Sequence, residues 1–285
     1  METPSENPLI PKSNISHKKN PPPTIHYISI IIFYIIFIVI IYTITTLFIL
    51  NKNKNLFLRI IIGILFYFSI LMTIISHYKT IIIDNTIDYI NPINLNLNNF
   101  CDKCNCERPL RSHHCKICGV CNLKMDHHCP WILNCVGEKN EKYFYLFLCY
   151  TFLTCFFIFF STLDLFFYSI SNYQIYNEKN FINYFYHFFL SYDNYLSFFS
   201  FFFSFIIGFS VLYLIYFSWL HIKIGLSTIE MKIYEKNLND CPYYNDNWKD
   251  NFIKIFGNNI YKMFLPIEND INQNEILENN YVEIK

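Results

Sequence analysis

The sequence is short of charge. Only 15% of its 285 residues are charged, whereas a typical soluble domain has about 25%. It contains no alanine, while Ile, Asn, Phe, Tyr and Lys are abundant. This bias indicates an AT-rich coding background, so single Asn or Lys residues in loops carry little information. Hydrophobic residues make up 53% of the chain and aromatic residues 20%, and this composition excludes an ordinary soluble protein.

The chain also lacks an excess of either charge. Its 22 Lys and Arg residues balance 22 Asp and Glu residues. Without a global basic field, the composition argues against a nucleic-acid partner. Residues 1–26 are polar and contain three consecutive prolines at positions 21–23, so we expect a disordered tail. This tail does not resemble a signal peptide, because the apolar run after it starts too late and is too long.

Four long apolar runs dominate the rest of the chain. They cover residues 27–50, 56–76, 143–170 and 195–220. About 20 apolar residues are enough to cross the hydrocarbon layer of a bilayer, and inside lipid only a helix satisfies its own backbone within one segment. The sequence therefore predicts an all-α membrane protein with four transmembrane helices. The expected parts are a tail (1–26), helices one and two (27–76), a linker and Cys/His segment (77–142, core 101–142), helices three and four (143–220) and a second tail (221–285).

The positive charges are distributed unevenly between these parts. Of the 22 Lys and Arg residues, 18 lie in the two tails and in the segment between the second and third runs. Basic residues collect on the cytosolic side of membrane proteins. We therefore expect a multi-pass protein of the endoplasmic reticulum, Golgi or plasma membrane, with both termini and the Cys/His segment in the cytosol.

Cysteine and histidine are concentrated in one short segment. Eight of the eleven cysteines and four histidines lie between Cys101 and Cys135. Paired cysteines two residues apart, mixed with histidines, are typical of zinc binding in a reducing compartment. The segment is too short and polar to build its own core, so metal would supply the folding energy. Two zinc ions need eight ligands, and spacing alone does not say which four of the twelve candidates are spare.

The run Asp126-His127-His128-Cys129 has two interpretations. Structural zinc needs no carboxylate, whereas nucleophilic catalysis uses a thiol, a base and a carboxylate that orients the base. The simpler interpretation is that these residues are only metal ligands and loop. Chemistry alone leaves both open.

The whole segment resembles the cysteine-rich domain of the DHHC family of protein acyltransferases. The resemblance covers Cys101 to Phe144, with the four-helix layout around it. It is carried by Arg108-Pro109, Arg111, His113-His114-Cys115, Asp126 to Trp131, Asn134 to Gly137 and Asn140. Two positions depart from the family pattern. The usual Asp-Pro-Gly motif after the second helix is missing, and Leu133 stands where the family usually has Asn.

The resemblance implies a role for most of these residues. It implies Cys129 as the acylated nucleophile, His127 as general base and Asp126 as the residue that orients it. Cys106 and His113 receive no role. The implied ligands are Cys101, Cys104, His114 and Cys121 for one zinc ion, and Cys115, Cys118, His128 and Cys135 for the other.

Two motifs in the second tail resemble family elements more weakly. Ser227-Thr228-Ile229-Glu230 resembles a Thr-Thr-x-Glu motif, and residues 247–257 resemble a C-terminal element with Asn251 at its polar position. The resemblance implies that Thr228, Glu230 and Asn251 support the active site structurally. His187 and His221 lie outside these motifs, and we expect interface or loop positions for both.

The implied function is a protein S-acyltransferase. It would move a long-chain acyl group, palmitoyl, from acyl-CoA to cysteines of membrane-associated proteins near the bilayer, with two structural zinc ions. Candidate cations for the CoA phosphates are Arg108, Arg111, Lys116, Lys124, Lys139 and Lys142. The alternatives are a non-catalytic zinc-stabilised membrane adaptor and a membrane ubiquitin ligase. The intact Asp126, His127 and Cys129 argue against the adaptor, and the ligand spacing argues against the ligase.

Overall fold

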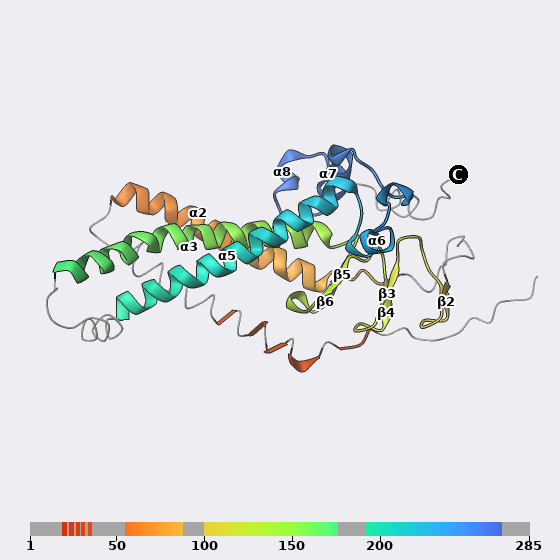
Figure 1. Cartoon of the computed structure of the whole chain (residues 1–285), viewed down its shortest axis with the longest axis horizontal. Helices are drawn as coiled ribbons and strands as arrows, with labels where there is room; N and C mark the ends of the chain where they lie inside the picture. Colours follow the sequence, from red (N-terminus) through yellow and green to blue (C-terminus); the bar gives the residue numbers. More distant parts are fainter. Residues whose placement is uncertain are drawn as a thin grey trace, which may run out of the picture.

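In the part of the chain that the structure describes, three long helices form the helical body (Figure 1). The computed structural model describes residues 55–87, 100–175 and 192–269, with scattered residues between 19 and 35. Helix α3 (Glu141–Ile175) packs against both α2 (Leu56–Ile82) and α5 (Tyr192–Ile224). The expected first span, residues 27–50, lies largely outside the described residues.

The three helices are long and apolar enough to cross a membrane. The apolar stretches are Leu56–Ile82, Glu141–Leu163 and Phe198–Ile224. Only 22% of the stretch in α5 is buried inside the molecule, so most of its phenylalanine-rich surface needs a non-aqueous surrounding. The mean rise of 1.5 Å per residue gives α2 a length of about 40 Å, sufficient to span a bilayer core of about 30 Å.

Polar and small side chains join the helices where they touch. The hydroxyl groups of Ser69 in α2 and Thr154 in α3 are 2.9 Å apart and fully buried. Gly208 in α5 lies against Cys155 in α3, and a Cβ atom at this glycine would stand 3.2 Å from that of Cys155. Membrane helices associate through hydrogen bonds between hydroxyl groups and through small residues that allow close packing. The hydrophobic effect does not drive this association, because lipid is as apolar as the side chains.

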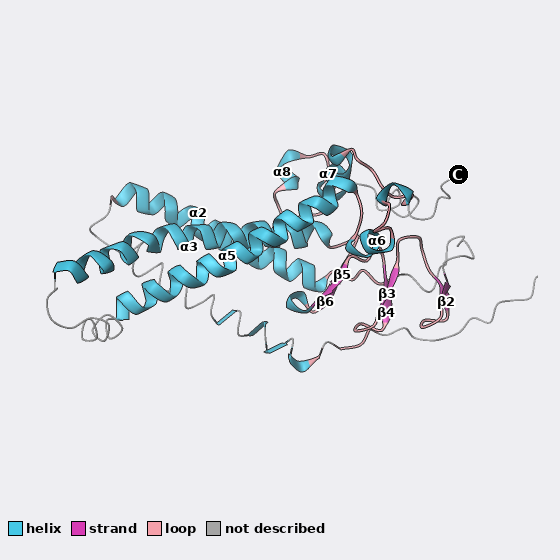
Figure 2. Ribbon diagram, in the orientation of Figure 1, coloured by secondary structure: helices cyan, strands magenta, loops and turns pink. Residues whose placement is uncertain are grey.

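The region between α2 and α3 consists of hairpins, so an all-α description fits only the helical body. Three two-stranded antiparallel hairpins lie at one end of the helices (Figure 2). Strand β1 (Phe100–Cys101) pairs with β2 (Cys106–Glu107), β3 (His113–Cys115) with β4 (Val120–Asn122), and β5 (His127–Cys129) with β6 (Asn134–Val136). Periodicity could not predict strands this short.

Three short helices follow α5 at the same end of the molecule (Figure 1). They are α6 (Thr228–Ile233), α7 (Trp248–Phe256) and α8 (Ile260–Met263). Phe256 of α7 and Ile222 of α5 belong to one apolar cluster with Cys129 and the first turns of α3. The nucleophile predicted from the sequence therefore lies where the hairpins, the long helices and the C-terminal helices meet.

Three buried asparagines attach the hairpins to the end of α2. The amide nitrogen of Asn134 in β6 donates to the carbonyl oxygens of Thr80, Ile81 and Ile83 at 3.2, 3.1 and 2.8 Å. Asn140 donates to the Thr80 carbonyl as well. The last carbonyls of a helix have no partner within the helix, so these amides cap α2.

Asn85 completes the attachment just beyond α2. Its amide donates to the Cys135 carbonyl and accepts from the Lys139 backbone. Gly137 fits beside it only because it lacks a side chain, since a Cβ atom there would stand 2.5 Å from the Leu123 carbonyl oxygen.

Removing the Asn134 amide should therefore destabilise the protein. We expect Asn134→Ala to lower the free energy of unfolding by about 1–3 kcal/mol, the cost of leaving buried polar groups without partners. Thermal unfolding of the detergent-solubilised protein measures the change. The matched control is Asn239→Ala at an exposed position, which should leave the melting temperature unchanged. Equal melting temperatures for both variants would contradict the capping role.

Candidate active site and metal centres

The hairpins bring eight cysteine and histidine ligands into two groups. In the register of β3 and β4, His114 lies directly opposite Cys121, and in that of β5 and β6, His128 lies opposite Cys135. Each His–Cys pair is completed by a Cys-x-x-Cys turn. The groups are Cys101, Cys104, His114 and Cys121, and Cys115, Cys118, His128 and Cys135, with the ligand atoms of each group within 4.8 Å of one another.

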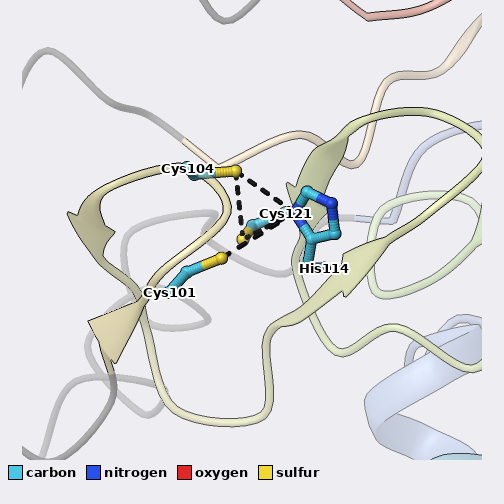
Figure 3. A group of neighbouring side chains, drawn as sticks. All are labelled: Cys101, Cys104, His114 and Cys121. Carbon is cyan, nitrogen blue, oxygen red and sulfur yellow. Dashed lines mark hydrogen bonds between the residues drawn. The ribbon is translucent and has the colours of Figure 1, made fainter.

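The first group has the dimensions of a tetrahedral metal site (Figure 3). The Nδ1 atom of His114 lies 3.2 Å from the Cys104 sulfur and 3.8 Å from the Cys101 sulfur. The Cys121 sulfur lies 4.0 Å from the same nitrogen and 3.8 Å from the Cys104 sulfur. With Zn–S near 2.3 Å and Zn–N near 2.1 Å, tetrahedral zinc places its ligand atoms about 3.6–3.8 Å apart.

The second group repeats this geometry. The Nδ1 atom of His128 lies 3.4 Å from the Cys118 sulfur and 3.7 Å from those of Cys115 and Cys135. The Cys118 and Cys135 sulfurs are 3.6 Å apart. Both groups therefore fit a metal ion bound by three sulfurs and one nitrogen.

A cation at the centre of each group would stabilise its thiolates. Burial raises the pKa of the Cys121 thiol, and its neighbours Cys101 and Cys104 raise it further. In the second group, Cys115 and Cys118 raise the pKa of Cys135. A divalent metal reverses this situation, because it binds thiolates and offsets their mutual repulsion.

Cys106 lies beside the first group but outside it. Burial and the nearby Cys104 and Cys101 raise the pKa of its thiol to about 11. A thiol with so high a pKa is a poor nucleophile at neutral pH. Cys106 and His113 belong to neither ligand group, as the resemblance implied.

Strand β5 separates metal binding from the candidate chemistry. Successive side chains of a strand point to opposite faces. His128 binds within the second group, so His127 and Cys129 share the other face. Cys129 is only 7% exposed and packs in the apolar cluster with Ile132 and Phe144.

Asp126 and His127 form a hydrogen-bonded pair beside this thiol. The Nδ1 atom of His127 is 2.7 Å from Oδ2 of Asp126, and the ring stands edge-on to Phe144 at 5.5 Å between centroids. Burial lowers the pKa of the His127 ring, but the hydrogen bonds with Asp126 and Cys129 outweigh it and raise that pKa to about 9. The protonated form of the ring is therefore favoured at this position, which is the form that follows proton transfer from a thiol.

The second oxygen of Asp126 is held by the start of α6. Both the backbone N–H and the hydroxyl of Thr228 donate to Oδ1, the hydroxyl at 2.6 Å. Burial alone would raise the pKa of the Asp126 carboxyl, but the hydrogen bonds from His127 and Thr228 lower it to about 2. The carboxylate is therefore charged and fixed in orientation.

An ion pair holds α6 in place. Arg111 contacts Glu230 through two hydrogen bonds of 2.6 and 2.7 Å and donates to the Gly225 carbonyl. Glu230 also accepts from the Ser227 backbone, while the Ser227 hydroxyl accepts from the Glu230 backbone, which is a capping box. Burial raises the pKa of Glu230, and Arg111 outweighs burial and lowers it.

Asn251 fixes the end of α5, from which α6 follows. Its amide nitrogen donates to the Lys223 carbonyl at 3.2 Å and to the Asn245 carbonyl at 2.7 Å. Gly225 has a φ of +71°, and a Cβ atom there would stand 2.9 Å from Oδ1 of Asn251. Glycine is favoured at such a helix end because its left-handed conformation costs other residues energy. Asn251 thus affects the position of Asp126 indirectly, by holding the end of α5 and with it the start of α6.

Leu133, one of the departures from the family pattern, also has a left-handed backbone, with a φ of 53°. Asn tolerates this conformation better than Leu does, at a difference of order 1 kcal/mol. Leu at this position therefore adds backbone strain between Cys129 and Asn134.

The structure changes the expectation for His221. Its Nδ1 atom lies 3.8 Å from Oδ1 of Asp126, so it is neither a loop residue nor remote from the site. No local sequence signal pointed to this contact, because only the fold brings α5 to Asp126. His187 lies outside the described residues.

Comparison with known proteins agrees with this geometry. Residues 94–235, about half of the chain, match the family model described as DHHC palmitoyltransferase. The chain is 36% identical over 171 residues to "Probable protein S-acyltransferase 13" of Arabidopsis thaliana, over 59% of this chain and 51% of the relative.

Two further relatives match over shorter stretches. The chain is 58% identical over 59 residues to "Palmitoyltransferase ZDHHC15" of Xenopus laevis, which covers 21% of this chain and 18% of the relative. It is 37% identical over 118 residues to "Palmitoyltransferase ZDHHC7" of Mus musculus, over 38% of each chain. The chain thus spans about half the length of these relatives or less. Residues 94–235, with their paired Cys/His groups and the Asp126-His127-His128-Cys129 run, place the chain in the DHHC palmitoyltransferase family.

Proposed function

We propose that the chain is a protein S-acyltransferase that moves palmitoyl or a similar long acyl group from acyl-CoA to cysteines of target proteins. One observation carries the proposal. Cys129 and His127 share a face of β5, with Asp126 bound to His127, at the end of the membrane helices. This arrangement of nucleophile, base and orienting carboxylate is the one that covalent acyl transfer uses.

The proposed reaction has two steps. The Cys129 sulfur attacks the thioester carbonyl of acyl-CoA, its proton passes to His127, and CoA leaves as a thiol after receiving that proton. The product is a thioester on Cys129. A cysteine of the target protein then gives its proton to His127 and attacks this thioester, which restores the Cys129 thiol. Asp126 keeps the His127 ring oriented and stabilises its protonated form.

The surroundings of Cys129 suit a long acyl chain. The thiol lies in the apolar cluster that includes Ile132, Phe144 and Leu148, at the end of helices whose outer surface suits lipid. Burial of each CH₂ group contributes about 0.8 kcal/mol. An acyl chain would therefore extend from Cys129 towards the helices, while the CoA head stays in water.

Three of the six candidate cations for CoA have internal partners. Arg111 pairs with Glu230, Lys124 with Glu141, and Lys142 donates to the Lys262 and Ile267 carbonyls. We therefore propose Arg108, Lys116 and Lys139 as the cations that contact the CoA phosphates.

Two zinc ions are the metals that we propose for the Cys/His groups. Zinc bound by four protein atoms has no open position and supplies structure only. The ligands then fold the hairpins and fix β5, while the acyl transfer uses protein side chains alone.

The uneven distribution of Lys and Arg supports a cytosolic location for the hairpins and both termini. The hairpins and α6 to α8 lie at the same end of the helices, which agrees with this orientation. Target cysteines would then lie close to the cytosolic face of an endomembrane or the plasma membrane.

Labelling with acyl-CoA tests the nucleophile. Purified protein incubated with an alkyne-tagged palmitoyl-CoA should carry a label that neutral hydroxylamine removes, and Cys129→Ser should carry none. The matched control is Cys149→Ser, at an exposed cysteine of α3, which should label like the wild type. An unlabelled wild type that still contains its metal would favour the adaptor instead.

Metal content tests the ligand assignment. We expect about two zinc ions per chain by elemental mass spectrometry, one for each Cys/His group. Cys121→Ser should lose more than one, because His114 of the first group and Cys115 of the second are adjacent in β3, and disorder at one site spreads to the other. Cys106→Ser is the control and should keep both ions. Loss of zinc from Cys106→Ser would contradict the assignment.

Thr228→Val tests the support of Asp126. It removes the hydroxyl that donates to Oδ1 but keeps the backbone donor. A hydrogen bond to a charged group contributes about 1.5–3 kcal/mol, so we expect the acylation rate of Cys129 to fall about tenfold or more. Thr162→Val is the control, because the Thr162 hydroxyl donates within its own helix to the Ile158 and Phe159 carbonyls. Equal rates for the two variants would show that the hydroxyl does not support Asp126.

A further inference from the structure

His221 is a second imidazole at the Asp126 carboxylate. It lies in the last turns of α5, is 5% exposed and stands edge-on to Phe217 at 4.4 Å between centroids. Its Nδ1 atom is 3.8 Å from Oδ1 of Asp126, whereas His127 contacts Oδ2. The carboxylate thus has a histidine at each oxygen.

The other nitrogen of His221 has no protein partner. Its Nε2 atom is fully buried and forms no hydrogen bond with the residues that the structure describes. A buried polar atom without a partner is unfavourable, so such atoms commonly bind water. His221 lines a cavity of about 50 Å³ that is also lined by Arg111, Lys124, Glu141 and Tyr145. This volume exceeds the roughly 15 Å³ that one water needs, and the lining is polar.

The contacts of Asp126 determine which nitrogen of His221 carries a proton. Both oxygens of Asp126 accept hydrogen bonds, Oδ2 at His127 and Oδ1 from Thr228. The His221 nitrogen that faces Oδ1 is therefore a donor and carries the proton. In a neutral ring with Nδ1 protonated, Nε2 is an acceptor.

We propose that His221 is a positioning residue that donates from Nδ1 to Oδ1 of Asp126 and, through it, holds His127 against Cys129. This inference rests on the proposed function for its role in acyl transfer. The 3.8 Å separation exceeds a hydrogen bond. Such bonds in active sites are often long without substrate and shorten in the complex.

Three substitutions separate the nitrogen atoms from the volume of the ring. His221→Phe keeps the ring against Phe217 and removes both nitrogens. His221→Asn places an amide nitrogen near the position of Nδ1, and His221→Gln places one near that of Nε2. Ser204→Ala is the control, because Ser204 is a buried residue of the same helix whose hydroxyl donates only to the Phe201 carbonyl.

Two rates are measured on the full-length protein in detergent. The first is alkylation of Cys129 by iodoacetamide, followed on the Cys129 peptide by mass spectrometry. The second is formation of the acyl-enzyme from tagged palmitoyl-CoA over a range of concentrations. We expect His221→Phe to slow both rates by about 10–100-fold, as the loss of a partner that orients a functional side chain does. The half-saturating acyl-CoA concentration should not change.

The three variants distinguish donation from Nδ1 from a role in packing alone. Recovery of both rates in His221→Asn, but not in His221→Gln, supports donation from Nδ1. Wild-type rates in His221→Phe, or equal losses in all three variants, overturn the proposal, because packing alone would then explain the residue. Zinc content and melting temperature show which variants fold. If His221→Phe does not fold, a faster His221→Asn than His221→Gln supports the proposal, and equal rates oppose it.

The two readouts keep this inference separate from the proposed function. If the wild type forms no acyl-enzyme, the proposed function fails, while the alkylation rates still show whether His221 acts on Cys129 through Asp126 and His127.

Discussion

Each of the two Cys/His groups places three thiols and one imidazole within 4.8 Å of one another. The structure of this end of the molecule depends on holding these groups together. Buried thiolates so close together repel one another unless a cation lies between them. The hairpins have strands of two or three residues and small apolar clusters around the cysteines. Bonds to the proposed metal ions would therefore take the place of an apolar core. The second group fixes β5, and β5 carries His127 and Cys129 on its free face.

Distant parts of the chain converge on Asp126. Thr228 follows α5 and Arg111 precedes β3, and both help to fix the Asp126 carboxylate. Thr228 does so by direct hydrogen bonds, and Arg111 does so through Glu230 and α6. The buried ion pair between Arg111 and Glu230 is a costly element unless both charges are fully paired. Here the guanidinium and the carboxylate pair through two hydrogen bonds, and each also bonds backbone. The pair thus fixes where α6 begins, and α6 supplies both donors from Thr228.

The parts that the sequence predicted are those encoded by local spacing. The Cys-x-x-Cys spacing predicted metal binding, whereas the two ligand sets and the roles of Asp126, His127 and Cys129 came from the family resemblance. The capping of α2 by asparagines escaped prediction. Asn134 and Asn140 were named only as part of the family resemblance, and Asn85 carried no signal because Asn is so common here. His221 escaped because its contact with Asp126 depends on how α5 crosses the hairpins. Strands of two or three residues are too short for periodicity to indicate, so the hairpins were not predicted either.

The attachment of Asn134 to α2 also determines where the thiol stands relative to the bilayer. Cys129 lies directly opposite Asn134 in the hairpin register. The Asn134 amide donates hydrogen bonds to the carbonyls at the end of α2. If α2 spans the bilayer as proposed, this attachment would hold the sulfur at one height above the hydrocarbon layer. In the proposed reaction, a target thiol would then reach Cys129 only when its own membrane anchor holds it near that height.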